Sequence, residues 1–148
     1  MNDRFLRVLP YLLLAAGLLG FAARSAHAGD ASPLSGSYQL LQRTDIGSHA
    51  RLRLQIQLTN SGLNDFRVER LMFWDSSHRD PRAAQACSVL VRARSSAVTV
   101  REFVLDRAQY ESWKRGAQPR LLLELEMPGG HKSVSVVRLN RVSDRKVN

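Results

Sequence analysis

The turn "DIGSH" contains the residue types most suited to catalysis. Asp45, Ser48 and His49 are the three side-chain types of a hydrolase triad. Their crowding into one turn provides neither the strand-to-helix support of a serine nucleophile nor a base placed at a distance from it. We therefore interpret "DIGSH" as a solvated turn.

A second polar group follows in "DSSHRD". Asp75, His78 and Asp80 offer oxygen and nitrogen donors within six residues. Arg79 and Arg82 lie among them, however, and the spacing matches neither an EF-hand loop nor a zinc site. We expect a polar loop here and no metal site.

The other candidates for chemistry have structural explanations. Cys87 is the only cysteine and falls on the apolar side of an expected strand, so a buried and inert thiol is predicted. The segment "PGGH" (128–131) reads as a hairpin turn and lacks the helix start of a phosphate-binding loop. We therefore predict no catalytic residue and no cofactor, and expect that the protein is not an enzyme.

Trp74 is a candidate for a partly exposed, partner-binding side chain. With Phe73 facing the core, the next side chain faces outward, beside an expected loop over 75–86. A tryptophan next to an arginine-containing loop is typical of a partner-binding surface. The alternative is that the loop folds back and covers it. The candidate partner-binding residues are Trp74, His78, Arg79 and Arg82.

The chain is basic, with 22 lysines and arginines against 13 acidic residues. Five arginines take outward or edge positions on three expected strands, where they would form one basic face: Arg51, Arg53, Arg92, Arg94 and Arg101. Such a face attracts anionic polymers, for example lipopolysaccharide or acidic polysaccharide. The alternatives are the codon bias of a G+C-rich genome and charges that discourage edge-to-edge aggregation. Nucleic acid is not expected as a partner, because no aromatic residues interleave with these arginines.

Residues 1–28 have the three-part pattern of a secretory signal peptide. Arg4 and Arg7 precede an uncharged, leucine-rich run over 8–23, and Ala26 and Ala28 occupy the cleavage-site positions. An uncleaved anchor is the alternative, but the run is shorter than the ~20 apolar residues that span a bilayer. We expect an exported protein, periplasmic or secreted, with no membrane span after cleavage.

The remaining chain predicts seven short strands. Strict alternation marks residues 51–60 as a strand with one buried face. The third strand needs a β-bulge near Glu69 and Arg70. The fifth needs a shift at Arg101 and Glu102, so that Val98, Val100, Phe103 and Leu105 can all face inward. The expected strands are 38–44, 51–60, 66–75, 87–94, 97–105, 120–127 and 132–142.

One helical turn is expected between the fifth and sixth strands. Asp106 and Gln109 have the spacing of a capping box, and Gly116 is placed to end the helix in the left-handed conformation. Tyr110 and Trp113 share one helical face. We expect this aromatic pair to close the open end of the fold, the alternative being stacking on a sugar or peptide.

Seven strands with such turns resemble an immunoglobulin-like or fibronectin-type III β-sandwich in architecture. The resemblance implies an all-β domain over 37–142, between a flexible lead-in at 29–36 and a charged tail at 143–148, with hairpins joining strands two to three, four to five and six to seven. It also implies a non-enzymatic accessory module that binds an envelope or secreted protein. The alternative function is binding of an anionic surface polymer through the arginine face.

Overall fold

The computed structural model describes residues 32–74 and 84–142. The predicted signal peptide, the charged tail and residues 75–83, which include His78, Arg79 and Arg82, lie outside the described part. Its elements are β1 (Leu34–Ile46), β2 (His49–Asn60), β3 (Phe66–Phe73), β4 (Gln85–Val91), β5 (Ser95–Asp106), α1 (Arg107–Lys114), β6 (Arg120–Glu126) and β7 (Lys132–Arg141).

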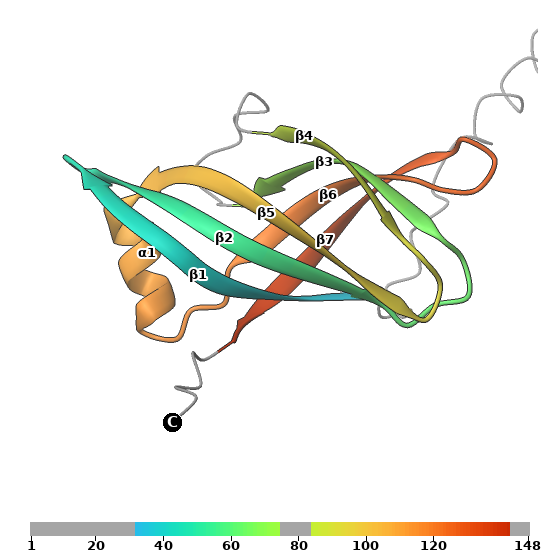
Figure 1. Cartoon of the computed structure of the whole chain (residues 1–148), viewed down its shortest axis with the longest axis horizontal. Helices are drawn as coiled ribbons and strands as arrows, with labels where there is room; N and C mark the ends of the chain where they lie inside the picture. The colour runs from blue at the N-terminus through green and yellow to red at the C-terminus, as the bar shows by residue number, and fades with distance from the viewer. Residues whose placement is uncertain (1–31, 75–83, 143–148) are drawn as a thin grey trace, which may run out of the picture. The chain divides into compact units, whose positions relative to one another are not determined.

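The seven strands form one mixed sheet in the order β4-β3-β6-β7-β1-β2-β5. β7 changes partner along its length, since residues 132–138 pair with β6 and residues 139–141 pair in parallel with β1. The sheet curls until it is nearly closed as a barrel (Figure 1). The prediction of an all-β fold with one short helix after the fifth strand is confirmed. The finer prediction, an immunoglobulin-like sandwich of two sheets, is not confirmed, because the seven strands form one nearly closed sheet.

The hairpin predictions are only partly correct. β6 and β7 form the predicted hairpin. β2 does not pair with β3, because it lies between β1 and β5 and pairs with both along its length. β4 does not pair with β5 either, since these two strands are the opposite edges of the sheet. The tight turn between β1 and β2 contains Gly47 at φ 58°, a left-handed conformation that favours glycine.

The core lies inside the curled sheet. The leucine face of β2 is completely buried, as the alternation predicts, and it packs in one cluster with the inward leucines of β6. The predicted bulge in β3 is present as a register shift between Val68 and Arg70, which lets Val68 and Leu71 both face inward. Burying each such side chain contributes ~1.5–3 kcal/mol of transfer free energy.

β5 contradicts its prediction, because it has no register shift. Its pairing with β2 runs without interruption from Asp106 to Ser95. Side chains alternate strictly along such a ladder, so Arg101 and Phe103 share the inward face while Val98 and Val100 are exposed on the outer face. Twelve continuous backbone pairs therefore decide the orientation, and the two valines remain in solvent.

The helix closes one end of the barrel. Tyr110 and Trp113 are buried, and the Trp113 ring centroid lies 4.8 Å from that of Phe73 and 5.9 Å from that of Tyr38. Gly116, at φ 102°, ends the helix as predicted. The Asp106 side chain makes no capping hydrogen bond, contrary to the capping-box prediction; its carboxylate contacts His49 at 3.3 Å.

A buried asparagine joins strands near the other end. Asn60 is completely buried, and its Nδ2 donates to the carbonyl oxygens of Asn64 at 2.8 Å and Arg92 at 3.2 Å. Its Oδ1 accepts a hydrogen bond from the amide of Gly62 at 2.9 Å. The end of β2 is thereby tied to the segment that follows β4.

Candidate functional site

Trp74 follows β3 directly and is half-buried. Phe73 pairs with Leu121 on the buried face, and the backbone amide of Trp74 donates to the carbonyl oxygen of Arg120 at 2.7 Å. Because side chains alternate along a strand, Trp74 and Arg120 lie side by side on the outer face.

Trp74 borders an open hollow of about 320 Å³, the Trp74 hollow. We call the buried pair Tyr110 and Trp113 of α1 the aromatic plug. Trp113 of this plug lines the hollow together with polar and charged side chains: Asp106, Gln109, Ser112, Gln118 and Arg120. The Ser112 hydroxyl donates to the carbonyl oxygen of Gln109 at 2.6 Å. Sequence reasoning identified Trp74 and considered Trp113 as a stacking residue, but it missed the polar residues opposite Trp74, because only the fold brings them together.

A second hollow of about 390 Å³ adjoins the first, and we call it the Arg120–Arg138 hollow. Gly116, Gln118, Arg120 and Arg138 line it. It shares two of these residues, Gln118 and Arg120, with the Trp74 hollow. Gln118 Nε2 donates to Asn140 Oδ1 at 2.8 Å, which holds the shared wall against β7.

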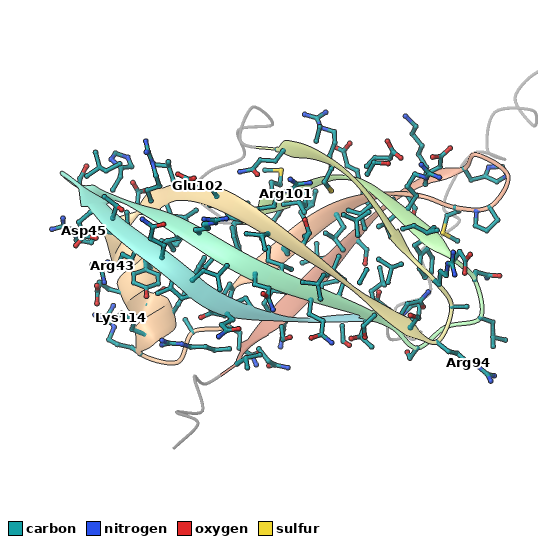
Figure 2. The ribbon with its side chains drawn as sticks, viewed as in Figure 1. Arg43, Asp45, Arg94, Arg101, Glu102 and Lys114 are labelled. Atoms are coloured by element: carbon teal, nitrogen blue, oxygen red, sulfur yellow. The ribbon has the colours of Figure 1, made fainter. Side chains whose placement is uncertain are left out.

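The structure does not bring the five predicted arginines into one face. Arg51 and Arg53 lie on the outer face of β2, and Arg51 Nε is 3.2 Å from Glu102 Oε1. Arg92 and Arg94 lie in the turn after β4, an edge strand on the far side of the sheet order from β2. Figure 2 shows Arg94 far from Arg43 and Lys114, at the opposite end of the barrel.

Arg101 points into the barrel, toward Cys87. The two edge strands β4 and β5 approach each other here, and Gln85 Nε2 donates to the Glu102 carbonyl oxygen at 2.6 Å. Burial raises the pKa of the Cys87 thiol, and the nearby Arg101 guanidinium partly offsets this. The thiol is also hydrogen-bonded to the Val68 carbonyl oxygen at 3.4 Å. A buried thiol with a raised pKa is a poor nucleophile.

The triad-type residues of the β1–β2 turn do make contacts. Ser48 Oγ lies 3.1 Å from His49 Nδ1, and His49 Nε2 lies 3.3 Å from Asp106 Oδ1. The His49 and Asp106 side chains are 51% and 41% exposed, and neither Ser48 nor His49 lines either hollow. These three side chains therefore lie at the surface, open to solvent.

Asp45 belongs to a separate charged network between the turn and the helix. Arg43 binds its carboxylate through two hydrogen bonds, at 2.7 and 2.9 Å, and this lowers the pKa of Asp45. Arg43 also lies 3.4 Å from Glu111 and 4.8 Å above the Tyr110 ring. Lys114 lies 2.8 Å from Glu111 and lowers the pKa of its carboxyl. These contacts hold α1 against the barrel (Figure 2).

Metal ligands do not cluster in residues 32–74 and 84–142, where no group of three His, Cys, Asp or Glu side chains is placed to hold an ion. The helix in this part of the chain is also too short and too polar to cross a bilayer.

Comparison with known proteins assigns no family. No family model matches the sequence, and a search of curated proteins finds no match. Among solved structures, a Northeast Structural Genomics Consortium target is similar, with a TM-score of 0.44, 9% identity, and coverage of 78% of this chain and 90% of that one. A protein from Archaeoglobus fulgidus has a TM-score of 0.36 and 11% identity, with 70% and 90% covered.

Proposed function

We propose that this chain is an exported, non-enzymatic module that binds another envelope or secreted protein at the Trp74 hollow. The observation that carries the proposal is a half-buried tryptophan at the edge of an open hollow, backed by the aromatic plug. Partially exposed tryptophans beside such hollows act as anchor points in protein interfaces.

The lining of the Trp74 hollow favours binding over catalysis. Gln109, Ser112 and Gln118 offer neutral hydrogen-bonding groups, which fix the orientation of a ligand. Asp106, the acidic residue of the lining, contacts His49 outside the hollow. A partner side chain inserted here would meet one aromatic wall and several polar donors and acceptors.

Export and the immunoglobulin-like arrangement are part of the same proposal. The sequence pattern of residues 1–28 supports export. Support for the immunoglobulin-like arrangement comes from two strand groups, β1-β2-β5 and β4-β3-β6-β7, linked by the parallel pairing of β1 with β7. Modules of this architecture present sheet faces and edges to partner proteins.

Site-specific photo-crosslinking tests the proposal. A photoreactive residue at Ala117, in the hollow, should capture a discrete envelope or secreted protein in intact cells. Trp74→Ala should abolish that adduct because it removes the anchor. The matched control is the same photoreactive residue at Gln57, which is exposed on the outer face of β2, and it should not capture this protein.

Two results would contradict the proposal. One is the same adduct from positions 117 and 57, which indicates capture without a specific site. The other is an adduct at position 117 that Trp74→Ala leaves unchanged. Thermal unfolding of Trp74→Ala establishes that a lost adduct does not reflect a lost fold.

A further inference from the structure

Trp74, Arg120 and Arg138 form one row across three neighbouring strands. Arg120 and Arg138 are direct partners in the β6–β7 ladder, and the Trp74 amide donates to the Arg120 carbonyl oxygen. The preceding row, Phe73, Leu121 and Val137, is buried. The row that contains Trp74 therefore lies on the outer face, with the ring at one end and two guanidinium groups beside it.

This row places two positive charges directly opposite each other. Like charges at opposed positions of an antiparallel pair destabilise the sheet. In the described part of the chain, no acidic side chain lies within 4 Å of Arg120 or Arg138, whereas Arg43, Arg51 and Arg70 each have such a partner. The positive charge of this row is thus not neutralised by the described residues.

The two arginines also share a hollow. The Arg120–Arg138 hollow has room for an oxyanion, and its wall is fixed through the Gln118–Asn140 hydrogen bond. Guanidinium groups present forked donors that match the two oxygens of a carboxylate or those of a phosphate. An oxyanion here would reduce the repulsion between the two charges.

We propose that Arg120 and Arg138 form an oxyanion site that binds carboxylates of an acidic peptide segment in the protein partner. The inference rests on the proposed function and names the chemistry of the segment bound. Because this site shares Arg120 and Gln118 with the Trp74 hollow, one segment fills both, with an apolar or aromatic residue in the Trp74 hollow and acidic residues next to it.

A polymeric polyanion fits this surface less well. Such a ligand needs a continuous track of unpaired cations. At the helix end of the barrel, Arg43 contacts two acidic residues and Lys114 contacts Glu111, so neither side chain extends the unpaired charge of this row. A short acidic segment needs only the two guanidinium groups of Arg120 and Arg138.

Fluorescence anisotropy of a labelled Glu-Glu-Trp-Glu-Glu peptide on the full chain tests the inference. The double variant Arg120→Gln/Arg138→Gln should weaken binding about tenfold or more, which corresponds to about 1.4 kcal/mol, and raised salt should weaken binding to the unmodified protein. The matched control Arg51→Gln/Arg53→Gln removes the same charge from β2 and should leave the affinity unchanged. A Gln-Gln-Trp-Gln-Gln peptide should bind more weakly.

Equal affinity of the peptide for the unmodified chain and the Arg120→Gln/Arg138→Gln variant would overturn the inference. So would binding of inorganic phosphate or polyphosphate that depends on these arginines, in the absence of peptide binding, because it would identify a phosphate ligand. If the double variant keeps its adduct at position 117 while Trp74→Ala loses it, this inference fails and the proposed function stands.

Discussion

The outer faces of the two strand groups use arginine differently. On β2, Arg51 lies 3.2 Å from Glu102 of the neighbouring strand, so its charge is balanced within the sheet. On β6 and β7, Arg120 and Arg138 oppose each other without an acidic partner among the described residues. Both faces also expose valines, for example Val98 on β5 and Val136 on β7. Exposed apolar area therefore does not distinguish the two faces, whereas unbalanced charge does.

The comparison shows that an outward arginine is not by itself a binding signal. The alternation of "ARLRLQIQLTN" correctly places Arg51 and Arg53 in solvent. Whether such a charge is available to a ligand depends on the strand that pairs next to it. Arg120 and Arg138, which face each other without an acidic partner among the described residues, lie at the start of β6 and inside β7, and no alternating pattern connects them.

The largest effect is expected where the two strand groups are joined. Asn60→Ala should reduce the free energy of unfolding by about 2–4 kcal/mol, because it removes a buried hydrogen bond to the Val91 carbonyl oxygen and part-buried ones to the backbone of Arg92 and Gly62. Urea unfolding measures this loss. The control is Asn64→Ala, an exposed position whose backbone carbonyl is retained, and it should change stability little. Equal losses from both variants would show that Asn60 does not join the groups.

Reversing one arginine charge on each outer face should change the free energy of unfolding by smaller amounts, with opposite signs on β6 and β2. Arg120→Glu replaces a like-charged pair by an opposite one and should raise the free energy of unfolding by about 0.5 kcal/mol. Arg51→Glu breaks the contact with Glu102 and should lower it by a similar amount. Urea unfolding in low salt measures both, and 1 M salt should reduce both. Two changes of the same sign would contradict the proposed charge difference.

The smallest effect concerns the pH dependence of the network at the helix end. The pKa of Asp45 is lowered from 3.8 by its hydrogen bonds with Arg43, and the pKa of Glu111 is lowered from 4.5, mainly by Lys114. Depressed pKa values stabilise the fold above the unfolded-state pKa, and this stabilisation is lost as pH falls through the folded-state values. Arg43→Gln should therefore destabilise the protein at pH 6, and by less at pH 3. Urea unfolding at both pH values tests this, and a constant difference would exclude the ionic origin.

Much of the fold was predictable, because patterns among residues close together in the sequence determine several of its elements. The leucine alternation of β2, the bulge in β3 and the glycine end of α1 follow from side-chain periodicity and backbone conformation. The pairing of β2 with β5 was not predictable in the same way, because hydrogen bonds between distant strands leave no local signature. The error at Arg101 follows from this, since the partner strand decided which face it occupies.

The candidate site was predictable only at Trp74. The orientation of that side chain follows from the core position of Phe73, a relation between neighbours in the sequence. The opposite walls, from α1 and β6, and the neighbouring Arg120–Arg138 hollow come from segments more than thirty residues away. No spacing rule connects these residues.

By itself, the sequence determined the strand content, the buried leucine face, the aromatic helix and the outward direction of Trp74, because each depends on residues close together in the chain. Only the tertiary structure decided which arginines meet an acidic residue and which meet each other. The physical reason is that charge compensation acts over a few ångströms in space, and strand order, not sequence distance, sets those distances.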